Sequence, residues 1–379
     1  MTGHYDWVKF PAAFWAGWYD IFLVGNLAAF KGYNEESDPS VRNTAKIMVD
    51  PLGHCQKGAE YFTQDLIAGR SLLSLMQAYE VYGIRPVTRP NIKNVTFYVM
   101  SSNDEAGLST ANYWTSQDSF PTPKMTYYYA HADGSASLTK PADTEVNQTS
   151  YVYDPADPVP TMGGANLHPP CGPVDQVDID KRADVLLFQT PVQDKALFMT
   201  GPLFANLFVG SDAVDTDFMV RISDVYPTGE VRLIQDSAVR MRWREGGLTP
   251  VLMKPDEVYN ITVSLWNTSY AIAPGHALRF AVTSSNYPRF SANPNNGLLL
   301  IQNGTNNVPV VAKNILFHSS QYPSSFMLPV VQKHQLPELH DIKLQFQKAY
   351  PHIDVDKMLE GEREKLLRME DGLRKRVVG

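Results

Sequence analysis

His54 is the first residue whose type and surroundings could support chemistry. It closes the loop Asp50-Pro51-Leu52-Gly53-His54, which follows a compact β-prone run at residues 45–49. In α/β folds, loops of this kind present a reactive imidazole at the carboxyl end of a strand, where it can take up and return a proton. A histidine in a loop is also often an ordinary surface residue. The pattern leaves both interpretations open.

Asp20 is the second candidate, because it ends the segment Gly17-Trp18-Tyr19-Asp20 between two apolar runs within residues 10–30. The second run, from Ile21 to Ala28, has helical spacing, so Asp20 falls just before or at the start of a helix. An aspartate at this place can cap the helix by accepting hydrogen bonds from its first backbone amides. Capping alone would account for Asp20.

A helical segment follows the histidine loop. Residues 59–82 carry apolar side chains at the spacing of one or two amphipathic helices: Phe62, Leu66, Leu72, Leu73, Leu75, Met76 and Tyr79. Strand, loop and helix together resemble the last βα unit of an α/β domain. Because one or two strands cannot make a stable parallel sheet, we expect the rest of that domain to lie outside this chain.

The middle of the chain alternates with the period of two of β-strands. Within residues 203–233, Phe218, Val220 and Ile222 point one way and Met219, Arg221 and Ser223 the other, which predicts a half-buried strand. The turn Tyr226-Pro227-Thr228-Gly229 follows and makes the unit a hairpin. Similar alternation predicts further strands at 239–244, 259–265 and 278–282, and it places Phe280 in the core.

Short strands separated by Pro, Gly and Asn are typical of a two-sheet β-sandwich or jelly roll. We therefore predict an α/β plus all-β chain of three parts. Residues 1–88 form the C-terminal part of an α/β domain, residues 89–332 a jelly-roll sandwich, and residues 333–379 a helical extension. In this extension, residues 354–377 carry a stripe of apolar side chains at helical spacing. This helix either packs on the body or a partner, or stays solvated.

Composition excludes several classes of protein. The net charge of −7 disfavours nucleic acid as a partner, and no apolar run reaches the length of about 18 residues that a membrane span needs. We expect no cofactor and no metal, since His4, His168 and His318 lack a ligand spacing. The oligomeric state, including a homo-oligomer, stays open.

Cysteines and glycosylation sequons bear on the compartment. Cys55 and Cys171 are the only cysteines, and they form either a disulfide or two buried thiols. Five Asn-X-Ser/Thr sequons favour the secretory pathway: Asn94, Asn147, Asn260, Asn267 and Asn303.

Many separated runs match one family in the same order. The chain resembles the serine hydrolases that include cocaine esterase, α-amino acid ester hydrolases, glutaryl acylases and X-prolyl dipeptidyl aminopeptidases, over about residues 10–330. The matching runs are 17–20, 50–54, 153–164, 172–176, 184–186, 210–218, 224–225, 275–279, 284–295 and 318–329.

The resemblance implies roles for both candidate residues. The family combines an α/β-hydrolase domain, a helical cap and a jelly roll, resembling the galactose-binding fold. By this likeness Asp20 is the triad aspartate and His54 the triad histidine of an enzyme that hydrolyses a small acyl ester or a peptide. Asp50 and Leu52 depart from the Gly-Pro-Trp that usually precedes the family's histidine.

The nucleophile that such an enzyme needs is not encoded in this sequence. No Gly-X-Ser-X-Gly elbow occurs in the 379 residues, and Ser71 and Ser74 follow the histidine, against the family's order of Ser, Asp and His. The implied partner is therefore a missing N-terminal hydrolase segment.

Two alternatives remain. One is a binding module whose loops 212–217 and 293–296 hold Ca²⁺ or a glycan; the other is a pseudoenzyme scaffold acting through its C-terminal helix.

Overall fold

The computed structural model describes residues 4–54, 62, 65–102, 109–143, 148–167, 170–298 and 307–361. The chain forms, in order, η1 (Tyr5–Trp7), β1 (Ala13–Tyr19), α1 (Leu23–Glu36), β2 (Lys46–Gly53), α2 (Asp65–Val81), β3 (Val95–Ser101), β4 (Tyr113–Gln117), β5 (Lys124–Ala130), β6 (Ala136–Ser137), β7 (Gln148–Tyr153), α3 (Val177–Asp180), β8 (Leu186–Gln189), β9 (Leu197–Ser211), β10 (Asp217–Val225), β11 (Val231–Arg240), η3 (Met241–Trp243), β12 (Tyr259–Ile272), β13 (Ala277–Thr283), β14 (Ala312–Phe317), β15 (Ser325–Val331), η4 (Lys333–Gln335) and α4 (Ile342–Ala349).

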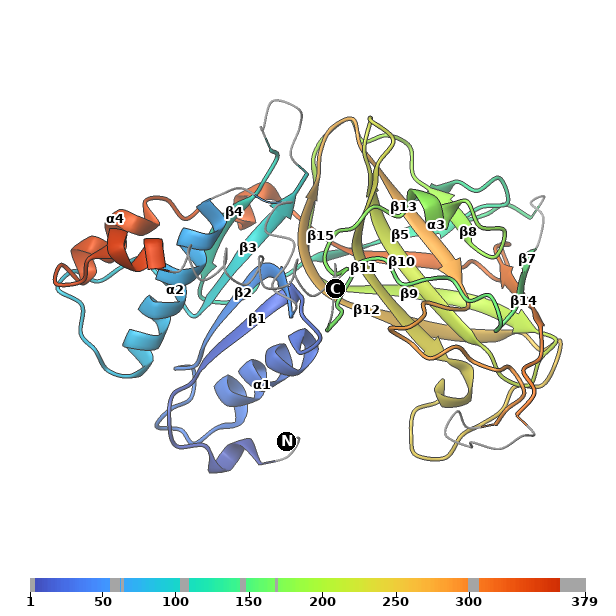
Figure 1. Ribbon diagram of the computed structural model, residues 1–379, viewed down its shortest axis with the longest axis horizontal. Coiled ribbons are helices and arrows are strands. Elements are labelled where there is room, and N and C mark those ends of the chain that lie inside the picture. The colour runs from blue at the N-terminus through green and yellow to red at the C-terminus, as the bar shows by residue number, and fades with distance from the viewer. Residues whose placement is uncertain are drawn as a thin grey trace, which may run out of the picture.

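The larger sheet begins as a parallel α/β sheet. Its strand order is β1-β2-β3-β12-β9-β15-β5-β6, and β1, β2 and β3 pair in parallel. All eight residues of β2 are buried, as expected for a strand covered on both faces. Figure 1 shows α1 on one side of these strands and α2 on the other.

The same sheet continues into the sandwich without a break. β3 pairs in parallel with β12 through Tyr270 opposite Met100 and Ala271 opposite Ser101. The Ser101 hydroxyl also donates to the Ala271 carbonyl at 2.9 Å. The strand that opens the expected second domain is thus hydrogen-bonded to β2 at residues 95–97, to β4 at residues 95–99 and to β12 at Met100 and Ser101.

A second sheet, in the order β11-β10-β13-β8, completes the β-rich region (Figure 1). Between the two sheets, Phe280 of β13 stacks on Phe326 of β15 with ring centroids 4.2 Å apart, and both side chains are fully buried. The observed architecture is a β-rich region joined to a short parallel sheet. The more specific name jelly roll stays a prediction.

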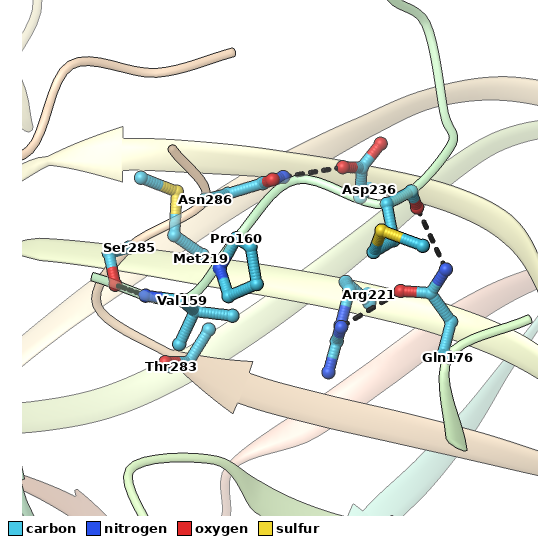
Figure 2. A pocket seen from close by; sticks show the side chains of 10 residues that line it. Val159, Pro160, Gln176, Met219, Arg221, Asp236, Thr283, Ser285 and Asn286 are labelled. Carbon is cyan, nitrogen blue, oxygen red and sulfur yellow. Dashed lines mark hydrogen bonds between the residues drawn. The ribbon is translucent and has the colours of Figure 1, made fainter. Parts of the chain in front are cut away.

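The predicted hairpin is present, since β10 pairs antiparallel with β11. The prediction that β10 is half-buried is wrong. Met219, Arg221 and Ser223 are buried like the opposite face, and Gln176 and Asp180 of the proline-rich segment 153–185 bind the Arg221 guanidinium. Figure 2 shows this layer, with Arg221 donating to Gln176 and the amide of Val159 donating to Ser285.

The prediction of a strand at residues 239–244 is also wrong beyond Arg240, where β11 ends. Met241–Trp243 form the 3₁₀ helix η3, and Arg242 is only 2% exposed. Its guanidinium pairs with fully buried Asp215, whose other oxygen accepts from the Arg242 amide at 2.8 Å. This ion pair, not sheet pairing, sets the local conformation.

The C-terminal extension packs on the α/β part. Tyr350, just after α4, meets Tyr79 of α2 edge to face at 4.9 Å, and the Val87 amide donates to the Ala349 carbonyl. Residues 355–361 are helical, and Val355 is buried. The expected helix at 354–377 begins here, and its residues beyond 361 lie outside the described part.

The remaining sequence-based expectations have mixed outcomes. In the described residues no helix is long and apolar enough to cross a membrane. Cys171 is disulfide-bonded, while Cys55 lies outside the described residues, as do Asn147, His168 and Asn303.

Candidate active site

Asp20 and His54 lie together at one edge of the parallel sheet. They directly follow β1 and β2, whose last residues, Tyr19 and Gly53, stand opposite each other in register. Carboxyl ends of adjacent parallel strands meet at the same edge, so the two side chains come within reach of each other. Asp20 Oδ2 is 3.4 Å from His54 Nδ1.

The Asp20 carboxylate is oriented by the start of α1. Its Oδ1 accepts a hydrogen bond from the Phe22 amide at 2.8 Å, which turns Oδ2 toward the imidazole. The Phe22 ring meets the His54 ring edge to face at 5.3 Å. Asp20 therefore precedes the helix as expected, and one oxygen is left for the histidine.

The residues before Asp20 are fastened to both sheets. Trp18 Nε1 donates to the Tyr98 carbonyl of β3, and the Tyr19 hydroxyl donates to the Leu233 carbonyl of β11, both at 2.8 Å. Burial raises the pKa of Tyr19 well above its usual value, so this hydroxyl stays protonated and able to donate. Contacts with β11 thereby fix the backbone that carries Asp20.

Gly17 allows the two loops to approach. A β-carbon built on Gly17 would lie 2.1 Å from the Leu52 carbonyl oxygen, closer than any side chain tolerates. Only glycine lets β1 run this close to the loop that ends in His54.

Asp50, one of the departures in the histidine loop, forms a contact that the sequence did not reveal. Its Oδ2 lies 2.5 Å from Arg70 Nε of α2, and its Oδ1 accepts from the Leu52 amide at 2.9 Å. Burial raises the pKa of Asp50, and the Arg70 charge opposes that rise. The pair connects the histidine loop to α2. The only sign of this contact in the sequence was Asp50 itself, which departs from the residues that usually precede the family's histidine.

Replacing Arg70 by methionine is expected to destabilise the protein more at about pH 8 than at about pH 4. The folded-state pKa of Asp50 is already above its unfolded value, so stability falls as pH rises from the unfolded pKa toward the folded one. Without Arg70 the folded-state pKa rises further and this window widens. Urea unfolding at both pH values measures the difference.

The double variant Asp50→Asn/Arg70→Met serves as the control, because it removes the ionisable group. Its stability loss should not depend on pH in the same way. An equal loss at both pH values in the single variant would mean that the ion pair does not govern this loop.

In the loops considered for Ca²⁺, the carboxylates accept hydrogen bonds from protein side chains. Asp215 Oδ2 accepts from Arg242 and Asn293, and both oxygens of Asp217 accept from Arg240. Among the described residues, no group of three or more His, Cys, Asp or Glu side chains is placed to hold a metal. His318 is buried and bonds Thr149 at 2.8 Å, and exposed His4 stacks on Trp7.

Comparisons with known proteins identify the family. Residues 91–326 match the model of the X-Pro dipeptidyl-peptidase C-terminal non-catalytic domain. The chain is 30% identical to cocaine esterase of Rhodococcus sp. (strain MB1 Bresler) over 343 residues, covering 85% of this chain and 57% of that protein.

Solved structures show the same fold. An α-amino acid ester hydrolase superposes with a TM-score of 0.71 at 21% identity, covering 85% of this chain and 56% of that one. An aminopeptidase from the marine sediment archaeon Thaumarchaeota archaeon gives 0.70 at 21% identity, covering 86% and 56%. The chain thus spans little more than half the length of these relatives. It belongs to the serine hydrolase family of cocaine esterase and the X-Pro dipeptidyl-peptidases, and it carries that family's C-terminal domain.

Proposed function

We propose that Asp20 and His54 are two members of a Ser-His-Asp triad that hydrolyses a small ester or a peptide bond. The observation that carries the proposal is the contact of 3.4 Å between Asp20 Oδ2 and His54 Nδ1 at the carboxyl edge of β1 and β2. Both residues lie outside the segment 91–326 that matches a non-catalytic domain. Catalysis and scaffolding would then be divided between different parts of the chain.

The contact orients His54 to act as a general base. With Nδ1 facing the carboxylate, Nε2 is the nitrogen left to take the proton from an attacking serine and to return it to the leaving group. Asp20 would hold the imidazole in that tautomer and stabilise the imidazolium that forms. The His54 side chain is 43% exposed, so its ring is accessible to a nucleophile and a substrate.

The serine nucleophile would come from a polypeptide segment outside these 379 residues. The sequence has no Gly-X-Ser-X-Gly elbow, and Ser74 Oγ is engaged with the Ser71 carbonyl at 3.0 Å. β1 ends the strand order of the larger sheet, so in the described residues its outer edge has no strand partner. A hydrolase segment could add its own strands there.

Labelling with a fluorophosphonate tests this division. In the active enzyme, the probe should modify a serine whose peptide maps outside the present sequence, because the probe reacts with activated serines. The purified 379-residue chain should remain unlabelled. A labelled serine within this sequence would contradict the proposed origin of the nucleophile, and an active enzyme that is never labelled would contradict acyl transfer by serine.

A further inference from the structure

Cys171 is disulfide-bonded and buried, in the proline-rich segment 153–185. The sequence holds one other cysteine, Cys55, and it directly follows His54. Cys171 lies within residues 91–326, which match the non-catalytic domain, whereas Cys55 lies outside them. A bond between the two would therefore attach the histidine loop covalently to the sandwich.

The described residues bring Cys171 close to the histidine loop. Its Sγ would lie 3.6 Å from a β-carbon built on Gly53, the last residue of β2. Cys55 stands two residues beyond Gly53, and two residues span about 7 Å at most. Since the Cα atoms of a disulfide are about 4.4–6.8 Å apart, Cys55 can reach Cys171 from the end of β2.

The main chain on both sides of Cys171 is held in place. Gly164 and Gly172 exchange two backbone hydrogen bonds, of 2.8 and 3.0 Å. Asn166 Nδ2 donates to the Pro170 carbonyl at 2.8 Å. Because its two neighbours in the chain are bonded in this way, Cys171 offers a fixed point to which a loop can be attached.

Leu233 of β11 anchors the segments next to both Asp20 and Cys171. Its carbonyl accepts from the Tyr19 hydroxyl at 2.8 Å, and its amide donates to the Val174 carbonyl at 3.2 Å. Tyr19 directly precedes Asp20, and Val174 lies three residues after Cys171. A bond from Cys171 to the histidine loop would thus refer both candidate catalytic residues to the same residue of the sandwich.

His54 depends on its backbone for its position. In the described part of the chain its side chain meets Asp20 at 3.4 Å and the Phe22 ring at 5.3 Å, and it is 43% exposed. A distance of 3.4 Å is longer than an ordinary N–H···O hydrogen bond, so this contact alone holds the ring weakly. A covalent bond at the next residue would fix the backbone from which the imidazole projects.

We propose that Cys171 forms a disulfide with Cys55 and acts as a positioning residue, which keeps His54 where Nδ1 faces Asp20. The inference rests on the proposed function, because the position of His54 matters for proton transfer. Cys171 itself touches neither the substrate nor the proton. Since Cys171 is only 4% exposed, the bond is shielded from reductants and serves as a permanent connection.

Peptide mapping of the purified chain without reduction tests the bond. Free thiols are first blocked by alkylation, and the digest is analysed by mass spectrometry. The peptide that contains His54 and Cys55 should be joined to the peptide that contains Cys171. Two alkylated thiols, or a link between the Cys171 residues of two chains, would overturn the inference.

NMR of the purified chain tests the positioning. The ring protons of Phe22 and His54 should give a nuclear Overhauser cross-peak, because the two rings meet edge to face. Cys171→Ser and Cys55→Ser should each abolish it, since each breaks the same bond. The double variant should match either single variant, because its second substitution has no bond left to break. A cross-peak that persists in the variants would overturn the positioning.

A second ring pair reports whether the variants are folded. Phe280 and Phe326 stack at 4.2 Å between the sheets, and their cross-peak should persist in every variant. If Cys171→Ser unfolds the sandwich, Cys55→Ser still gives the measurement, because it leaves the buried Cys171 side chain in place.

Kinetics of the assembled enzyme separate this inference from the catalytic proposal. Either serine variant should lower kcat by about a hundredfold and leave KM within about twofold, as expected for a misplaced base in an intact binding site. Loss of the Phe22–His54 cross-peak with unchanged kcat would overturn the catalytic function of His54 while supporting its positioning by Cys171. A retained cross-peak would overturn the positioning whatever the rate.

Discussion

Replacing His54 by alanine is expected to lower kcat/KM of the assembled enzyme by about four orders of magnitude. The variant removes the only base in contact with Asp20 among the described residues, so the serine hydroxyl has no acceptor for its proton. Since the His54 side chain is 43% exposed and outside the core, the melting temperature should change little. Steady-state ester hydrolysis and thermal unfolding measure the two effects separately.

His334→Ala is the matched control, because that histidine is exposed and lies on η4, far along the chain from the candidate site. It should leave both rate and melting temperature unchanged. Near-normal turnover in His54→Ala would remove this histidine from the mechanism. Asp20→Asn should also slow turnover strongly, because the amide cannot stabilise the imidazolium.

Replacing Phe280 by alanine is expected to reduce the free energy of unfolding by about 3–5 kcal/mol. The ring is fully buried between the two sheets and stacks on Phe326 at 4.2 Å, so truncation leaves a cavity and removes an aromatic pair. Urea or guanidinium unfolding, monitored by fluorescence and circular dichroism, gives the value.

Phe10→Ala provides a comparison of the same chemistry at a site that is 79% exposed. Its effect should stay within about 0.5 kcal/mol. A loss of similar size in the two variants would mean that Phe280 does not occupy the core between the sheets.

Strand alternation could be read from the sequence wherever one face meets solvent. In β12, Ile261, Val263 and Leu265 are buried while Asn260, Thr262 and Ser264 are exposed, as the period of two predicts. Local pattern and burial agree there because nothing else covers the polar face.

Alternation failed where a distant segment covers the polar face. Arg221 looked like a solvent-facing residue, yet Asp180 and Gln176 from the proline-rich segment bury it. Arg242 looked like the polar face of a strand, yet it pairs with Asp215, 27 residues earlier. Ion pairs between segments far apart in sequence leave no periodic signal.

Local patterns predicted that His54 follows a strand and that Asp20 precedes a helix, whereas the pairing of the two residues was expected only from the resemblance to a known family. The expected Asp20 and His54 segments do follow adjacent parallel strands. The Asp50–Arg70 pair could not be predicted from the sequence, because it depends on a partner from another element.

The pairing of β3 with β12 affects how the molecule can move. Hinged enzymes swing their lobes about a flexible joint that few contacts cross. Here β3 pairs with β12 at Met100 and Ser101, and the Tyr19 hydroxyl adds a hydrogen bond to β11. We therefore expect a ligand to move loops at the rim more than it changes the angle between the α/β part and the sandwich.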